Sequence, residues 1–233
     1  MPVRVLVDQK GLRGSTLITG FHGVGQTGYL ATSYLIHALK AVRIGFVEVE
    51  NPPPWIGTAD GGLVTPFEVY KHGKTVLVKL EFSPHKTEEA EFAKVLADWA
   101  IDRHFKDAVL IGGLDSSYKR TKDKYCVVPT GAYQDGFQRM RGEVLEPGLL
   151  VYGPLAVMLG EFEVHNFPAV AVLPFADPQR TDPGAAALAI RRISKAYGFR
   201  VRVEELVRDA KFVERDYDRK NRLTRGSLQH MYA

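Results

Sequence analysis

The sequence predicts an α/β protein: a three-layer α/β/α sandwich around a largely parallel sheet. Short apolar runs of strand length alternate with longer helical patterns along most of the chain. Such alternation builds a parallel sheet with helices on both faces. The unbroken apolar run at residues 108–111 is typical of a strand buried on both sides. The composition, with 45% hydrophobic and 25% charged residues, is that of an ordinary globular domain.

The first half of the chain contains two predicted helices and five predicted strands. Apolar residues at the helical period predict a helix over residues 29–39. A second stripe of this kind follows Thr87, which is placed to cap the second helix. The predicted strands are residues 3–7, 16–21, 44–49, 63–70 and 75–82, the last two forming a hairpin.

The second half continues the alternation. Gly153 and Pro154 are expected to start a helix that runs to about residue 163. Asp182 is expected to cap another helix, with proline at its first position and Gly198 at its end. The predicted strands here are residues 108–111, 125–128, 149–152 and 169–173. Residues 132–148 follow no pattern that predicts an element.

The domain organisation is predicted to be simple. Residues 1–210 contain no internal repeat or linker and are expected to form one domain. Residues 211–233 are strongly polar and are expected to form a flexible tail. The tail has six basic and three acidic side chains, so its net charge of +3 leaves about +1 of the total +4 for the rest. This distribution argues against nucleic acid as a partner.

Several classes of protein are disfavoured by simple features. No apolar run approaches the roughly 18 residues that cross a bilayer, and no signal-peptide pattern stands at the N-terminus. We therefore expect no membrane partner and a cytoplasmic location. The only cysteine is Cys126, which lies in an apolar run and is expected to be a small core residue.

A glycine motif raises the possibility of a nucleotide site. Gly23, Gly25 and Gly28 form G-x-G-x-x-G between a predicted strand and a helix, and Glu48 stands where a dinucleotide fold keeps its ribose-binding acid. Against this, a strand precedes the motif and residues 52–54 are three prolines. The glycines can instead serve close strand–helix packing. A nucleotide- or phosphate-binding enzyme that uses the glycine loop (residues 23–28) stays open as the alternative.

Other catalytic chemistry has little support. The seven histidines have no close pair at metal-ligand spacing, so no metal site is expected. Asp115, Ser116 and Ser117 follow a strand, but no G-x-S-x-G elbow is present. We therefore expect no catalytic residues and no cofactor.

Several segments, in a fixed order, resemble one known family. Thr19-Gly20-Phe21-His22-Gly23-Val24-Gly25 is similar to a Gly-Phe-Pro-Gly-Val-Gly loop, with His22 in place of proline, and it leads into residues 29–36, which are similar to a helix with a Tyr-Leu-Ile end. Further similar segments are Glu50-Asn51-Pro52-Pro53, Val109-Leu110-Ile111-Gly112-Gly113, Gly153-Pro154-Leu155-Ala156 and Asp182-Pro183-Gly184-Ala185-Ala186-Ala187. Over about residues 15–210 the chain resembles the archaeal branch of the proteasome assembly chaperone family.

This resemblance implies a binding protein rather than an enzyme. It implies an α/β/α domain like that of nucleoside phosphorylases, self-association into a homo-oligomer, and binding to proteasome α subunits. In the family the glycine loop belongs to the scaffold and no cofactor chemistry is attributed to it.

The last three residues extend the resemblance. Met231, Tyr232 and Ala233 are similar to the hydrophobic-tyrosine-any-residue terminus of proteasome activators and some assembly chaperones. By this resemblance they are the partner-binding residues, docking on the α subunits of the proteasome core particle. A structural oligomer whose tail is packed away is a third possibility.

Overall fold

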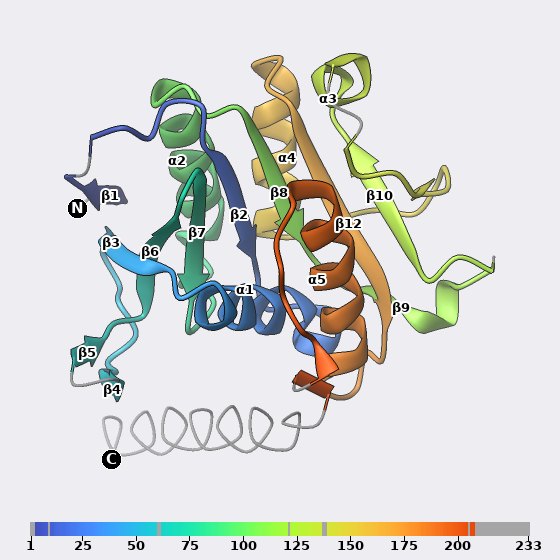
Figure 1. Cartoon of the computed structure of the whole chain (residues 1–233), viewed down its shortest axis with the longest axis horizontal. Coiled ribbons are helices and arrows are strands. Elements are labelled where there is room, and N and C mark those ends of the chain that lie inside the picture. Colours follow the sequence, from blue (N-terminus) through green and yellow to red (C-terminus); the bar gives the residue numbers. More distant parts are fainter. Residues whose placement is uncertain are drawn as a thin grey trace.

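A large β-sheet forms the centre of the molecule (Figure 1). The computed structural model describes residues 3–207 except 9, 60, 61, 121, 137, 138 and 205. Within these residues the sheet has ten strands: β1 (Arg4–Val7), β2 (Thr16–Gly20), β3 (Val42–Glu48), β6 (Phe67–His72), β7 (Thr75–Leu80), β8 (Asp107–Ile111), β9 (Leu114–Asp115), β10 (Tyr125–Pro129), β11 (Glu143–Val144) and β12 (Ala169–Ala176). A separate ribbon consists of β4 (Gly57–Ala59) and β5 (Gly62–Val64).

The sheet is parallel at its centre and mixed toward its edges. Its order is β1-β3-β6-β7-β2-β8-β12-β10-β11, and β9 pairs with β12. The neighbours β7, β2, β8 and β12 are parallel, whereas β1–β3, β3–β6, β6–β7 and β10–β12 are antiparallel pairs. The predicted largely parallel sheet is therefore confirmed for the central strands, and the predicted hairpin appears as β6–β7.

Helices cover both faces of the sheet, as predicted (Figure 1). On one face, Leu30 of α1 and Ile190 of α5 share a core with the sheet. On the other, Phe92 of α2 and Met158 of α4 share a second core. The helices are α1 (Thr27–Ala38), α2 (Glu89–Asp102), α3 (Gly131–Gly136), α4 (Pro154–Val164) and α5 (Pro183–Tyr197). This is the three-layer arrangement that alternating strands and helices favour.

The two ends of α5 match their sequence signals. The Asp182 carboxylate accepts a hydrogen bond from the Ala185 backbone N–H at 2.9 Å, which satisfies one of the free donors at the helix start. Gly198 ends the helix with φ +77°, a left-handed conformation that glycine adopts without a Cβ penalty.

The start of α2 differs from the prediction. Thr87 does not cap this helix: its hydroxyl is hydrogen bonded to the His85 ring, and the residue before the helix is Glu88. The Glu88 carboxylate turns toward the chain after β3, where it accepts from the backbone N–H groups of Glu50 and Asn51, both at 3.1 Å. The buried Glu88 carboxylate thus binds backbone groups that are distant in the chain and does not cap α2.

The predicted strand at residues 149–152 is wrong. These residues form no strand, and the position beside β10 is taken by β11, from the stretch that had no readable pattern. Leu150 and Tyr152 are exposed instead. A short apolar run matches the sequence pattern of a strand whether or not another strand lies beside it to form the hydrogen bonds.

Candidate functional site at the carboxyl edge of the sheet

The glycine loop joins β2 to α1 and lies at the carboxyl ends of the central strands. Its last glycine is at a point of very close approach. A Cβ on Gly28 would lie 2.4 Å from the Ile111 carbonyl oxygen, and a Cβ on Gly20 would lie 2.5 Å from the Gly28 Cα. Distances of this kind exclude any side chain. These glycines therefore let α1 pack directly against β2 and β8.

The middle of the loop is held by the other half of the molecule. Gly25 has φ +63°, and a Cβ there would lie 2.7 Å from the Ala176 Cβ at the end of β12. The Gly25 carbonyl accepts a hydrogen bond from the Asp182 N–H at 2.8 Å. At the start of α1, Thr27 is fully buried. A pyrophosphate needs open backbone N–H groups at a helix start, whereas Gly25 and Thr27 at the start of α1 are buried.

Glu48 is far from the place that a ribose-binding acid would need. It lies on β3, which β6 and β7 separate from β2. Its carboxylate is bound by the Arg4 guanidinium at 2.5 Å across the β1–β3 pair. A dinucleotide fold places this acid on the strand next to the glycine-bearing strand. Both features that suggested a nucleotide thus have structural roles, and the alternative gains no support.

A pocket of about 420 Å³ lies beside the glycine loop. It is at the carboxyl ends of β2 and β8, where open α/β sheets usually place their ligands. Its wall includes the start of α4 and the segment that had been expected to form a strand. The side chains at its mouth are largely apolar and exposed: Tyr118, Leu150 and Tyr152.

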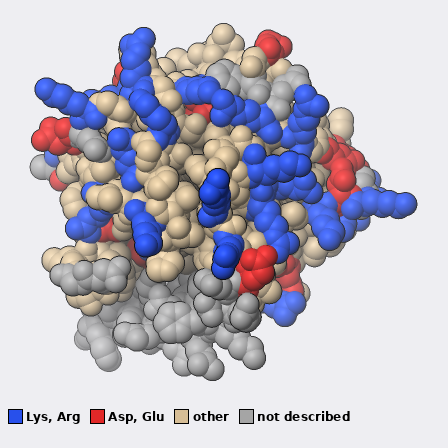
Figure 2. Space-filling model, viewed as in Figure 1, with Lys and Arg blue, Asp and Glu red and all other residues tan. Residues whose placement is uncertain are grey.

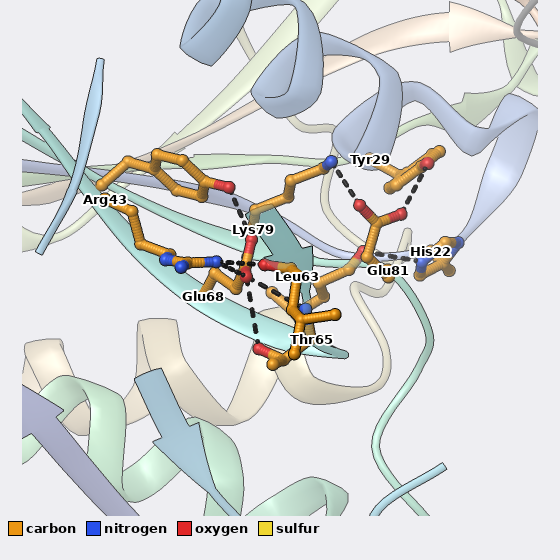
Figure 3. Close-up of polar contacts among 10 residues, drawn as sticks. His22, Tyr29, Arg43, Leu63, Thr65, Glu68, Lys79 and Glu81 are labelled. Carbon is orange, nitrogen blue, oxygen red and sulfur yellow. Dashed lines mark hydrogen bonds and ion pairs between the residues drawn. The ribbon is translucent and has the colours of Figure 1, made fainter. Parts of the chain in front are cut away.

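Next to this pocket, His22 is held by its neighbours (Figure 3). One ring nitrogen is 3.0 Å from the Leu80 carbonyl oxygen and the other is 2.7 Å from Gln26 Oε1. The ring also stacks on Tyr29, with the ring centroids 4.6 Å apart. Tyr29 in turn donates a hydrogen bond to Glu81. His22, at the position where the resembling family has proline, thus anchors the loop to β7.

Two buried carboxylates fix the antiparallel wing of the sheet (Figure 3). Glu81 is 3% exposed and pairs with Lys79. Glu68 is 1% exposed; it pairs with Arg43 at 2.7 Å and accepts from the Tyr70 hydroxyl at 2.5 Å. Burial and the adjacent Glu68 carboxylate raise the pKa of Tyr70. Buried charges are tolerated when they are paired and hydrogen bonded, so these groups have a structural role.

One group of metal-ligating side chains comes together among the described residues. Asp98 of α2, Glu161 of α4 and His165, which directly follows α4, have ligand atoms within 4.8 Å of one another. Lys94 already pairs with Glu161 at 3.3 Å, and the His165 ring is 2.9 Å from the Glu161 carbonyl oxygen. Sequence spacing missed this group because Asp98 lies on α2, far in the chain from the other two residues.

The predicted site residues fall in different places. Met231, Tyr232 and Ala233 lie outside the described residues, as does the whole predicted tail. Cys126 is buried, as expected, and burial raises the pKa of its thiol. No helix in the described part of the chain has the length and apolar character to span a bilayer.

Comparison with known families identifies the chain. The model of the PAC2 family matches residues 17–220. The chain belongs to the PAC2 family. A search of curated protein sequences finds no significant match.

Solved structures with the same fold include several proteasome-related proteins. The PAC2 chain is similar to Pyrococcus furiosus PbaA, an archaeal homologue of proteasome-assembly chaperone, with 21% identity and a TM-score of 0.83 over 97% of this chain and 100% of that one. It is also similar to P. furiosus PbaB, an archaeal proteasome activator, with 17% identity and a TM-score of 0.74 over 94% and 99%. A Mycobacterium tuberculosis proteasome-assembly chaperone homologue has 16% identity and a TM-score of 0.62 over 88% and 94%.

These findings confirm the predicted relationship at the level of family and fold. The segments that carried the resemblance lie within or next to the glycine loop, β8, α4 and α5, except residues 50–53, which follow β3.

Proposed function

We propose that this PAC2 protein is a non-enzymatic, cytoplasmic proteasome assembly chaperone or activator-like protein. It forms a homo-oligomer and docks on the α subunits of the proteasome core particle through Met231, Tyr232 and Ala233. Membership of the PAC2 family supports a proteasome-related role. The likeness to PbaA and PbaB over almost the whole chain supports the same role, because one is described as a chaperone homologue and the other as a proteasome activator.

The absence of an enzymatic function is supported by the carboxyl edge. The glycine loop packs against Ala176 and Asp182, which gives its middle residue, Gly25, a structural role. The neighbouring pocket has an apolar, exposed mouth, and such surfaces commonly contact proteins. We also propose that the domain resembles nucleoside phosphorylases in its architecture and not in its activity.

The docking step follows from the chemistry of a free C-terminus. The terminal carboxylate of Ala233 would pair with a lysine between two α subunits. Tyr232 would offer a rigid ring and a hydroxyl, and Met231 would fill an apolar recess. Residues 208–233 number 26, which allows a reach of at most about 90 Å if fully extended. A carboxylate at a chain end is a recognised docking handle.

Self-association would strengthen a weak individual contact. Ordering one short peptide has an entropic cost, so one terminus binds weakly. Several termini on one oligomer would engage neighbouring α-subunit pockets at a high effective concentration. The observation that carries the proposal is that one chain combines the PAC2 fold with a Met-Tyr-Ala terminus.

The test is binding of the purified chain to the core particle and to free α rings. Three forms are compared by surface plasmon resonance: the full chain, a form lacking residues 231–233, and a form in which Met231 and Tyr232 exchange places. The exchanged form keeps composition, length and terminal carboxylate, so it isolates the order of the motif. We expect binding by the full chain and at least tenfold weaker binding by the other two, which is about 1.4 kcal/mol.

Equal binding by all three forms would remove the tail from the proposal. If no form bound, the proteasome proposal itself would be wrong. Protease resistance of residues 211–233 in the free oligomer would then favour a structural oligomer with a packed tail.

A further inference from the structure

A second pocket, of about 340 Å³, lies near the C-terminal end of α5, whereas the glycine loop contacts Asp182 just before the start of this helix. Tyr125 of β10 and Met140 line it together with four cationic side chains: Arg139, Arg141, Arg192 and Lys195. Basic side chains gather on this face of the molecule, over α5 and β10 (Figure 2). Among the residues that the structure describes, no carboxylate lines this pocket.

Residues 139–141, which contribute two of the four cations, are held by hydrogen bonds to buried tyrosines. The Met140 N–H donates a hydrogen bond to the Tyr133 hydroxyl at 2.9 Å. The Arg141 carbonyl accepts one from the Tyr125 hydroxyl. Tyr133 is hydrogen bonded to Tyr197, and Tyr197 donates to the fully buried Asp107 at 2.9 Å. A buried chain of hydrogen bonds therefore fixes the backbone that carries Arg139 and Arg141.

Two of the three guanidinium groups lie over aromatic rings. The Arg192 guanidinium lies 5.0 Å from the centre of the Tyr125 ring, and that of Arg139 lies 5.5 Å from the Tyr197 ring. Such cation–π contacts position a guanidinium without neutralising it. By contrast, Arg191 on the same helix is paired with Glu204 at 3.7 Å. Among the ion pairs of the described residues, none involves the four cations of this pocket.

Four like charges around one small pocket repel one another unless an anion joins them. Arginine is well suited to phosphate, because its planar fork donates two parallel hydrogen bonds to two oxygens. Three of the four cations are arginines. The Tyr125 and Met140 side chains add apolar surface that a ring can contact, and the volume lies within the range of small-molecule sites.

We propose that this pocket binds a small anion with two or more linked phosphate groups, of the pyrophosphate or nucleoside polyphosphate class. Arg139, Arg141, Arg192 and Lys195 hold the phosphates, and Tyr125 and Met140 contact any attached ring. A nucleic acid fits less well, because it needs a continuous basic track along its backbone. A third pocket, lined by Lys119, Lys124 and Arg191, also contains the carboxylate of Asp182. This site is independent of the proteasome proposal and of the glycine loop.

The test is calorimetric titration of the full chain with pyrophosphate and, separately, with ATP. The salt concentration is about 150 mM, close to physiological ionic strength. Arg192→Met and Arg141→Met each remove one charge and keep an apolar stem. Arg103→Met is the matched control, because Arg103 follows α2 on the other face of the sheet. Thermal melting of every variant establishes that it is folded.

We expect both pocket variants to weaken binding about tenfold or more, as loss of a charge-assisted hydrogen bond does, and the control to change it less than about threefold. Equal affinity for both probes supports recognition of phosphate alone, and tighter binding of ATP supports a ring contact as well. Failure of the full chain to bind either probe overturns the proposal. An equal loss in Arg103→Met also overturns it. A third titration uses a single-stranded oligonucleotide, and binding of that probe alone would overturn the proposal as well.

Discussion

At Gly28, a single missing side chain determines how closely α1 approaches the sheet. A Cβ there would meet the Ile111 carbonyl oxygen at 2.4 Å and Phe21 backbone atoms at 2.7 Å. Backbone atoms cannot move aside as the end of a flexible side chain can. The G-x-G-x-x-G motif is therefore explained by the close packing of α1 on the sheet, although its sequence matches the pattern of a nucleotide-binding site.

We predict that Gly28→Ala lowers the free energy of unfolding by about 2 kcal/mol or more, because overpacking against backbone shifts both α1 and β8. Gly160→Ala is the control: Gly160 lies in α4 with no atom near its virtual Cβ. There alanine should raise stability by about 0.5–1 kcal/mol through helix propensity. Urea unfolding measures both. A neutral Gly28→Ala would contradict the packing role of the motif.

Buried tyrosines predict a pH dependence. Burial raises the pKa of Tyr70, Tyr133 and Tyr197, aided by nearby carboxylates at Tyr70 and Tyr197. An unfolded tyrosine titrates near about 10. Each raised pKa therefore contributes stability that is present below pH of about 10 and is lost as the pH rises above it.

We expect the free energy of unfolding to fall steadily above pH of about 10, because only the unfolded chain releases these phenolic protons. Ultraviolet absorbance of phenolate should rise in two steps, one from exposed tyrosines and one that accompanies unfolding. Tyr70→Phe should reduce the second step. A single step near the ordinary tyrosine pKa, with the protein still folded, would contradict the expectation.

At the scale of elements, helix ends were predicted well where the cap is local and poorly where it is not. Asp182 caps α5 through a residue three positions away, a spacing that sequence records. Thr87 also has the right residue type, but its hydroxyl bonds His85 instead. Residues 149–152 show the same limit for strands. Their apolar pattern fits a strand, but the pattern carries no information about whether a neighbouring strand can pair with them.

We predict that Asp182→Ala lowers the free energy of unfolding by about 1–2 kcal/mol, because the Ala185 N–H loses its acceptor. Asp182 also accepts from the Asp177 N–H at 3.2 Å, which places the effect toward the upper part of this range. Asp182→Asn retains a capping oxygen and should cost less than about 0.5 kcal/mol. Chemical denaturation distinguishes the two. Equal losses would assign the effect to the carboxylate charge rather than to the cap.

At the scale of the whole molecule, average charge conceals local charge. Residues outside the predicted tail have a net charge of only about +1, and this near-neutrality argued against nucleic acid as a partner. The fold nevertheless brings Arg139, Arg141, Arg192 and Lys195 around one pocket. Opposite charges elsewhere on the surface cancel in the sum but not at this site.

We predict that a chain ending at Ala210 unfolds cooperatively with the same midpoint as the full chain and no longer binds the proteasome core particle. The physical reason is that residues 211–233 have no periodic apolar stripe with which to join the core. Thermal melting and binding to the core particle measure the two effects. A clearly lower midpoint would place part of residues 211–220, which the PAC2 family model also covers, within the domain.

The sequence by itself determined the fold class, most helices and central strands and, through resemblance, the family. These features depend on local periodicity, on caps a few residues long and on short ordered segments. Whether the glycines serve packing or a ligand was left open by the sequence and followed from their close contacts in the structure. Only the tertiary structure decided the strand order, which separates Glu48 from the glycine loop by two strands. It also decided the basic pocket, which joins Tyr125, the segment around Met140 and the end of α5. Pairings between residues distant in the chain depend on the packing of the whole core, and no local pattern of residues records them.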